Sequence, residues 1–283
     1  MRDDEKAPRL AKAYPNIRAV KGNLNVSDTI EEEVKHADIV FQIADCDHVG
    51  AAKAIAKGAA HHPPDRPCWV RKKVYGDWDG VHELLNLPDD AYHRDVEKVI
   101  IEAGRGDPSR VKTVIVSPLT VYGVGRGYIK KSGIQVELLC AAVLQRQKKI
   151  LVGESKNVWS QVHVQDLSEV FLALGEAAAA GGGSVTWEDK GYYLADNGDY
   201  VWGDVERAAA RVAFEKGLIP SDEVLPFDES ELTSSNLGYV LFSWGSNSRS
   251  RGVRTRKLLG WEPKKPLLVD SIPDIFAAAV EVN

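Results

Sequence analysis

One helical stretch contains a lysine, an arginine and a histidine, whose side chains can polarise an oxygen atom or exchange a proton. In "AYHRDVEKVIIEAG", residues 91–104, Lys98 follows Arg94 by four positions, so the two side chains share one helix face. Arginine stays protonated at any relevant pH, so Arg94 can polarise an oxygen but is a poor proton donor. Two cationic side chains on one helix face can together hold and polarise a bound oxygen atom.

Two neighbours of Arg94 differ in how far they are turned around the same helix. Each residue advances an α-helix by about 100°, so Tyr92 lies about 200° from Arg94 and points away from the Lys98 face. His93 is offset by about 100° and reaches that face only if the helix start or a loop adapts. A capping or surface histidine is the alternative role for His93.

Bulk composition limits the classes of protein to which the chain can belong. Its 283 residues are 44% hydrophobic and 27% charged, which is typical of a globular protein with a sizeable core. The net charge of -5 and the pI of about 5.9 give no positive field for nucleic acid or an anionic membrane. The sequence contains no apolar run of about 18 residues and no secretory leader, so we expect a cytoplasmic protein.

The cysteines and histidines predict neither a disulfide framework nor a metal site. Cys46, Cys68 and Cys140 are far apart and form no C-x-x-C pair, which favours reduced thiols. His61, His62 and Cys68 are separated by a proline-rich stretch that fits no common ligand spacing. We expect no metal.

Short apolar runs alternate with helical stretches, the pattern of repeated βα units around a parallel sheet. The expected strands are 17–20, 38–45, 68–70 and 112–118. The expected helices begin at Ser27 or Asp28, cover 48–62, run from Asp89 or Asp90 to a C-cap at Gly104, and cover 133–148.

Five segments resemble extended short-chain dehydrogenase/reductases, in the order in which that family has them. They are "NIRAVKGNLNVSDTIEEEVKHADIVFQIAD" (16–45), "PLTVYGVGRG" (118–127), "VHVQDLSEVF" (162–171), "GYYLADNGDYVWGDV" (191–205) and "SRGVRTRKLLGWEPK" (250–264). The chain looks like the NAD-dependent epimerase/dehydratase-like proteins of fungi, an atypical branch close to NmrA-like proteins. The resemblance implies an α/β fold, a truncated doubly wound Rossmann-type parallel sheet with a smaller C-terminal substrate lobe. We place the nucleotide-binding domain at 1–123 and 159–200, and the lobe at 124–158 and 201–283.

The resemblance also implies features that this sequence does not have. The family begins with a G-x-x-G-x-x-G turn that holds the pyrophosphate at a helix N-terminus, and none precedes Ile17, so the chain is expected to begin about two strands late. The family's serine or threonine is missing between Cys68 and Lys98, and Arg94 stands where the family has its tyrosine, four residues before the lysine. By this resemblance, Lys98, Arg94 and His93 are the candidate catalytic residues. The strand 38–45 is expected to present an apolar edge and to pair with 17–20. We also expect this form to be less stable than full-length members of the family.

By motif position, the resemblance assigns binding roles to several residues. Contacts with NADP or NAD, weakened in this form, are assigned to Arg2, Asn23, Leu24, Ile43, Ala44, Asp45, Lys98, Pro118, Leu119, Thr120 and Val121. Asn23 departs from the family's aspartate and Asp45 from its usual small residue. Tyr122 and His163 are assigned to the substrate, although Tyr122 can equally be a buried aromatic residue. His163 with Asp166 can instead fix a loop by hydrogen bonding.

Three functional hypotheses follow from these observations. The first is an NAD(P)-binding epimerase/dehydratase-like protein or aldehyde/ketone oxidoreductase that is catalytically impaired and acts on an unknown small molecule. The second is a non-catalytic, NmrA-like nucleotide-sensing or partner-binding protein. The third is a structural fragment that another chain completes. The basic run 248–257 can attract a phosphate or form a solvated helix face, and a homodimer is left open.

Overall fold

The chain folds into two units, each assembled from three separate stretches. The structure, a computed structural model, describes residues 6–45, 47–61, 68–72, 77–86, 89, 93–128, 133–151, 154–226, 244 and 247–280. Unit 1 comprises Met1–Ser117, Val170–Ala195 and Gly252–Trp261, and unit 2 comprises Pro118–Glu169, Asp196–Arg251 and Glu262–Asn283.

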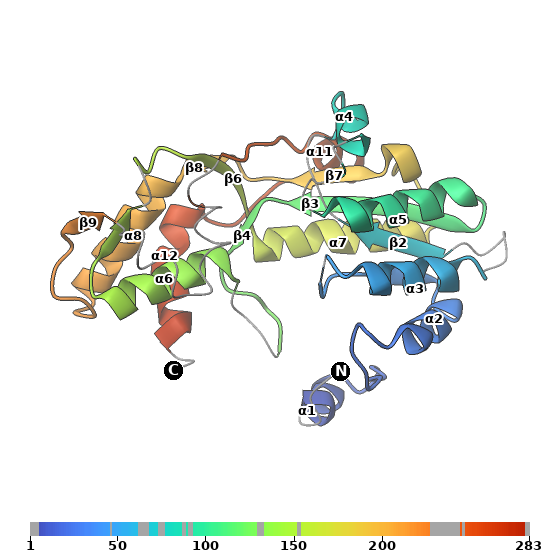
Figure 1. The fold of residues 1–283 in the computed structure, drawn as a ribbon, viewed down its shortest axis with the longest axis horizontal. Helices are drawn as coiled ribbons and strands as arrows, with labels where there is room; N and C mark the ends of the chain where they lie inside the picture. Colours follow the sequence, from blue (N-terminus) through green and yellow to red (C-terminus); the bar gives the residue numbers. More distant parts are fainter. Residues whose placement is uncertain are drawn as a thin grey trace. The chain divides into compact units, whose positions relative to one another are not determined.

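Unit 1 is built on a four-stranded sheet. The strands are β1 (Ile39–Phe41), β2 (Cys68–Lys72), β3 (Val111–Pro118) and β7 (Tyr192–Ala195), in the order β1-β2-β3-β7 (Figure 1). β2 runs parallel to both β1 and β3, with Val70 between Val40 and Thr113. The buried, nearly continuous apolar sequence of β3 suits an interior parallel strand, which is covered on both faces.

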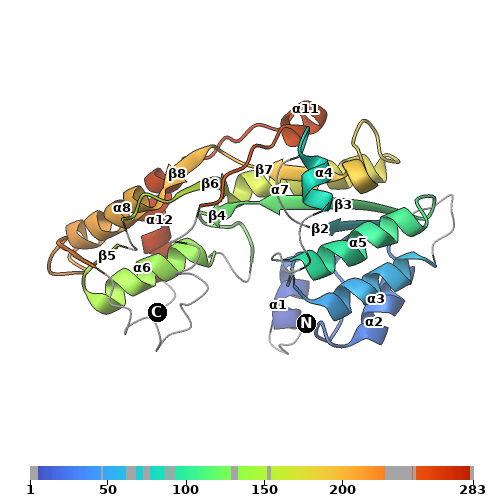
Figure 2. The same cartoon turned by 45° about the horizontal axis from the view of Figure 1, so that its top comes forward.

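Helices cover both faces of this sheet. Unit 1 contains α1 (Lys6–Ala13), α2 (Ser27–Lys35), α3 (Val49–Ala59), α4 (Val81–Leu85), α5 (Arg94–Gly106), the 3₁₀ turn η1 (Glu188–Lys190), α11 (Arg254–Leu259) and the last turns of α7 (Val164–Ala179). Figure 2 shows α3 and α5 along one side of β2 and β3. Successive strand residues face opposite sides, so Val40 packs with the core of α3 and α5 while Phe41 contacts Phe171 of α7, with ring centroids 6.4 Å apart.

Two details of α5 differ from the expected helix. It begins at Arg94 rather than near Asp89, because His93 adopts a left-handed conformation with φ of 67°. Gly104 lies inside α5, not at its C-cap. A Cβ atom at Gly104 would lie 2.3 Å from the Thr113 hydroxyl oxygen, so glycine there allows α5 to lie close against β3.

The expected strand at 17–20 and its pairing with the strand at 38–45 are both wrong. Residues 17–20 have no regular secondary structure, and β1, which is shorter than expected, bonds to β2 at one end of the sheet order. Ile17 is exposed, and Arg18 forms an ion pair with Glu33 of α2. A three-residue edge strand offers few hydrogen bonds, and the ion pair holds this segment to α2 instead.

The last segment of unit 1 is held by a buried carboxylate. Asp77 accepts backbone N–H bonds from Leu194 at 2.9 Å, Val253 at 2.8 Å and Arg254 at 3.2 Å. Burial raises the pKa of the Asp77 carboxyl, and the backbone donors oppose that rise. Residues distant in the sequence therefore meet at one acceptor.

Unit 2 combines short strands with three packed helices. One sheet contains β4 (Thr120–Tyr122), β6 (Val158–His163) and β8 (Asp199–Val201), in the order β4-β6-β8. A second sheet is the parallel pair β5 (Lys149–Leu151) and β9 (Val224–Pro226). β6 is parallel to β4 and antiparallel to β8. Among the described residues of unit 2, the helices are α6 (Gln135–Arg146), α8 (Trp202–Glu215) and α12 (Leu268–Val280), with the start of α7.

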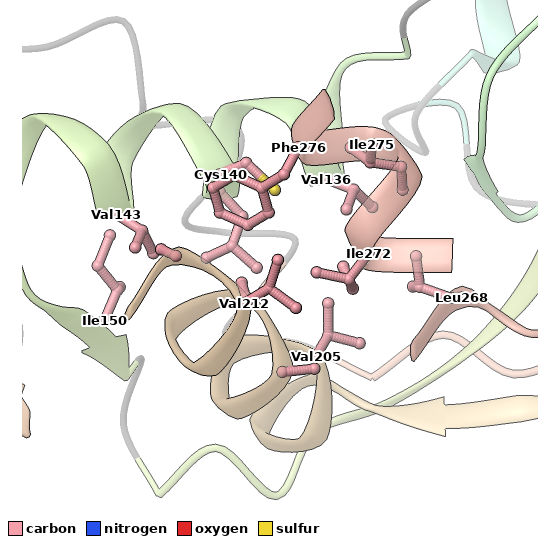
Figure 3. Packing of buried hydrophobic residues seen from close by; sticks show 14 of the residues in the cluster. Val136, Cys140, Val143, Ile150, Val205, Val212, Leu268, Ile272, Ile275 and Phe276 are labelled. Carbon is pink, nitrogen blue, oxygen red and sulfur yellow. The ribbon is translucent and has the colours of Figure 1, made fainter. Parts of the chain in front are cut away.

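The core of unit 2 lies between α6, α8 and α12. Figure 3 shows aliphatic side chains, Phe276 and the Cys140 thiol interdigitating between these helices. The contributing residues recur at helical spacing, as in Val136, Cys140 and Val143 of α6 and in Leu268, Ile272 and Phe276 of α12. Burying each large apolar side chain contributes about 1.5–3 kcal/mol, so this core anchors β4 and β6.

Candidate functional site

The loop that follows β1 gathers polar side chains at the carboxyl end of a parallel strand, where ligands bind in open α/β sheets. Asp45 accepts a hydrogen bond from the Asp47 backbone N–H at 3.0 Å, and its own carbonyl accepts one from Gln42 at 3.0 Å. His48 follows and caps α3, since its Nδ1 accepts from the Ala51 N–H at 2.9 Å. The turn is therefore ordered by its own side chains.

His48 also joins this loop to the segment before α2. Its Nε2 lies 2.8 Å from Asn25 Oδ1, and because Nδ1 is already an acceptor, Nε2–H is the donor. Asn25 in turn donates its backbone N–H to Asn23 Oδ1 at 2.8 Å. The predicted cofactor residues Asn23 and Asp45 are thus linked through Asn25, Asp47 and His48.

The start of α5 reaches the same loop. The His93 ring Nδ1 is hydrogen-bonded to Asp47 Oδ1, and the His93 side chain keeps 16% of its surface exposed. Lys98, one turn into the helix, pairs with Asp89 and is 33% exposed. We call Asn25, Asp45, Asp47, His48 and His93 the open edge, because three of them are exposed and two half-buried.

Three other predicted cofactor residues flank the open edge. Ile43 has 71% of its surface exposed, which is unusual for an isoleucine. Ala44 is also exposed and Leu24 is half-buried. Arg2 and Tyr92 lie outside the described residues.

Arg94 and Lys98 have different surroundings, although they lie one turn apart. The Arg94 guanidinium is buried and donates from Nη2 to the Leu85 carbonyl at 2.7 Å. Its Nη1 lies 3.9 Å from Glu97, a fully buried carboxylate that accepts from the Tyr192 hydroxyl at 3.1 Å. Arg94 is therefore engaged in the interior of unit 1, whereas Lys98 pairs at the surface.

In unit 2, β4 places the remaining predicted residues in the interior. Leu119 and Thr120 are buried and Pro118 and Val121 half-buried, and the Thr120 hydroxyl lies 2.7 Å from the Tyr200 hydroxyl. These two hydroxyls satisfy each other, so Thr120 is held by the packing of unit 2.

Tyr122 and His163 meet edge to face, with ring centroids 5.4 Å apart. The Tyr122 hydroxyl donates to the Pro266 carbonyl at 2.8 Å, and burial raises its pKa. His163 Nδ1 accepts from the Gln165 N–H at 3.1 Å, and burial lowers the pKa of its imidazole. A neutral His163 with its proton on Nε2 fits this setting.

Gly123 and Asp166 complete the surroundings of these two rings. Gly123 has φ of 87°, and a Cβ atom there would lie 2.1 Å from His163 Nε2. Asp166 is buried and accepts the backbone N–H groups of Lys264 at 3.1 Å and Lys265 at 3.0 Å, the loop-fixing role considered from the sequence. We call Tyr122, Gly123, His163 and Asp166 the closed cluster.

Sequence reasoning missed Asn25, Asp47 and His48. For Asp47 and His48 the signal was "DCDH", residues 45–48, in the loop after β1, because ligands bind beyond the carboxyl ends of parallel strands. Over the described part of the chain, no three His, Cys, Asp or Glu residues gather as a metal site. Nor does any helix in the described ranges have the length and apolar character needed to cross a membrane.

Comparisons with known proteins agree on the fold. No family model matches the chain. The oxidase ucsJ of Acremonium sp. is 30% identical over 310 aligned residues, covering 99% of this chain and 89% of that protein. UDP-glucose 4-epimerase from Thermotoga maritima, solved with UDP-glucose, gives a TM-score of 0.65 at 12% identity, over 95% of this chain and 86% of its own.

Two further structures extend the same comparison. dTDP-glucose 4,6-dehydratase from Bacillus anthracis, in complex with NAD, gives a TM-score of 0.65 at 13% identity, over 97% of this chain and 83% of its own. RMD from Pseudomonas aeruginosa, complexed with NADPH, gives a TM-score of 0.60 at 12% identity, over 98% of this chain and 95% of its own. The predicted α/β Rossmann-type fold of the epimerase/dehydratase kind is confirmed.

Proposed function

The chain belongs to the family of the Acremonium oxidase ucsJ, and from that premise we propose that it is an NAD(P)-binding, oxidoreductase-type protein with slow turnover. The nucleotide binds at the open edge of unit 1. The observation that carries this proposal is the hydrogen-bonded chain from Asn25 through His48 and from Asp47 to His93, at the carboxyl end of β1.

The open edge fits the adenosine half of a dinucleotide. Ile43 offers exposed apolar surface to a base, and burying that surface on binding favours association. The exposed carboxylate of Asp45 can accept hydrogen bonds from ribose hydroxyls. Both groups lie beyond the end of β1, within three residues of each other in the sequence.

The pyrophosphate half has less support. The 283-residue sequence has no G-x-x-G-x-x-G pattern, so no glycine turn of that kind places backbone N–H groups against phosphates. We therefore propose weakened binding of NADP or NAD relative to proteins with that turn.

Slow turnover follows from the residue at the start of α5. Hydride transfer to a carbonyl requires a proton donor near the oxygen. Arginine is a poor proton donor, and the Arg94 guanidinium is engaged with Leu85 and Glu97. The same observation supports the alternative, a non-catalytic NmrA-like nucleotide sensor, which differs from the first proposal in having no turnover at all.

Calorimetric titration of the purified chain with NADPH and with NADH tests the proposed site. We expect saturable binding that weakens several-fold in Ile43→Ser, because the base loses its apolar surface. Ile134→Ser changes an exposed isoleucine of unit 2 that the proposed site does not use, and it should bind as the wild type does.

Absence of binding to both nucleotides, or equal affinity in Ile43→Ser and wild type, contradicts the proposed site. A panel of aldehydes and ketones with NADPH then separates the two functions. Slow carbonyl-dependent NADPH oxidation supports the oxidoreductase, whereas tight binding without oxidation supports the sensor.

A further inference from the structure

An aspartate and a histidine form a side-chain pair at the point where α5 begins. The carboxylate of Asp47 can only accept hydrogen bonds when ionised, so the His93 Nδ1 carries the proton that joins them. This fixes the tautomer and the orientation of the imidazole. A carboxylate that orients a histidine in this way is the arrangement that general acid–base catalysis uses.

The backbone at His93 is strained in a way that supports a functional role. Its φ of 67° lies in the left-handed region, which non-glycine residues adopt at a cost of about 1–2 kcal/mol. Such conformations persist where the surroundings over-determine them, and they cluster at active sites. Here, the contact with Asp47, 46 residues earlier in the chain, is part of those surroundings.

The location of the pair suits proton exchange with a ligand. His93 immediately precedes α5, and Asp47 lies in the loop after β1, so both belong to the edge where parallel strands end. The His93 side chain keeps 16% of its surface exposed. With Nδ1 held by Asp47, Nε2 is the ring nitrogen whose protonation changes when the imidazole exchanges a proton.

We propose that His93, positioned by Asp47, is the proton donor for the slow carbonyl reduction of the proposed function, in place of a tyrosine. The proposal rests on that function. In this step His93 gives its Nε2 proton to the carbonyl oxygen, while the carbonyl carbon accepts a hydride from a bound reduced nicotinamide. The carbonyl is reduced to an alcohol, the nicotinamide is oxidised, and the neutral imidazole regains a proton from water.

His93→Gly is the informative variant, because glycine adopts positive φ without penalty and leaves a space for free imidazole. At saturating NADPH we expect a loss of carbonyl-dependent NADPH oxidation by about a hundred-fold or more, and recovery on adding imidazole. Asp47→Asn should lower the same rate by about ten-fold, because the amide orients the ring less well.

A histidine elsewhere in unit 1 supplies a matched control. His36 Nε2 lies 3.2 Å from Glu32 Oε1 on α2, and its side chain is 74% exposed. His36→Gly should keep the wild-type rate, with no response to imidazole.

A nuclear magnetic resonance measurement reports on the pair without turnover. The His93 Nδ1–H proton should give a protected resonance in wild type that disappears in Asp47→Asn. Loss of NADPH binding by the wild type would overturn the proposed function and this inference together.

Other outcomes bear on the inference alone. If NADPH binds but the wild type reduces no carbonyl, or if His93→Gly keeps the wild-type rate, the role of His93 is wrong while nucleotide binding stands. A rate lost in His93→Gly that imidazole does not restore assigns the pair a structural role and equally overturns the inference.

Discussion

The open edge of unit 1 and the closed cluster of unit 2 each contain a histidine, but the two histidines have opposite settings. His93 is hydrogen-bonded to the side chain of Asp47 and is partly exposed. His163 is buried and accepts from the Gln165 backbone, with Tyr122 and Gly123 against its ring. Polar groups that bond to each other at a surface can exchange partners with a ligand, whereas groups that hold buried backbone have a structural task.

The largest effect that separates the two regions is expected at Gly123. Gly123→Ala combines a positive φ with a Cβ atom that would lie 2.1 Å from His163 Nε2. We expect a loss of roughly 3 kcal/mol or more in the free energy of unfolding, measured in urea.

Gly198 separates the backbone cost of that change from the steric clash. Gly198 also has a positive φ, 75°, but no atom lies within 4 Å of an added Cβ. Gly198→Ala should therefore lower the free energy of unfolding by only about 1–2 kcal/mol. Equal losses at the two glycines would mean that the closed cluster is not tightly packed.

The second effect concerns Asp166. Asp166→Ala leaves the N–H groups of Lys264 and Lys265 without their acceptor, which should cost roughly 2–3 kcal/mol of stability by urea unfolding. Asp204→Ala, which removes an exposed ion pair with Arg207, should cost less than about 1 kcal/mol. If Asp47→Asn in the open edge destabilises as much as Asp166→Ala, the contrast between the regions fails.

Tyr122→Phe is expected to have a smaller effect and tests a residue that the sequence assigned to the substrate. The change removes the hydrogen bond to the Pro266 carbonyl and should lower stability by about 1 kcal/mol in thermal or urea unfolding. Tyr128→Phe, at an exposed tyrosine, should stay within about 0.5 kcal/mol of wild type. A loss of carbonyl turnover with unchanged stability in Tyr122→Phe would support the substrate role instead.

The smallest effect is a pH dependence due to His163. Burial lowers its pKa in the folded state, so below the unfolded value of about 6.5 the unfolded chain binds a proton more readily. The contribution of neutral His163 to the free energy of unfolding is fully present above about pH 6.5 and is lost as the pH falls. Stability measured from pH 7.5 to 5 should therefore fall less steeply in His163→Gln, and identical slopes would contradict a buried neutral imidazole.

Local pattern predicted much of the sheet but not the ends of its elements. The apolar run at 112–118 and the helical stretch before it appear as β3 and α5. The start of α5 depends on His93 and therefore on Asp47, 46 residues earlier, a contact that no local periodicity contains. The β-like sequence at 17–20 forms no strand, because a strand exists only with a neighbour to pair with.

The candidate site was predictable only as far as the family resemblance extended. Residues after β1, such as Ile43 and Asp45, were assigned by motif position, and they lie beyond the carboxyl end of a parallel strand, where ligands bind in open α/β sheets. Asn25 carried no motif, and Asp47 was marked only by its place in "DCDH" after β1. The Tyr122 hydroxyl donates to the carbonyl of Pro266, 144 residues later, so only the folded chain reveals this hydrogen bond. The roles of Lys98, Arg94 and the other assigned residues stay predictions.

The threading of the chain through the two units has a consequence for synthesis and dissection. Each unit is made of three stretches. The last stretch of unit 1, Gly252–Trp261, is held by Asp77, which is synthesised much earlier. A ribosome must therefore translate nearly the whole message before unit 1 can close around that carboxylate. No single cut of the gene yields either unit as one continuous piece, so pieces intended for separate expression need the stretches rejoined by circular permutation or engineered connectors.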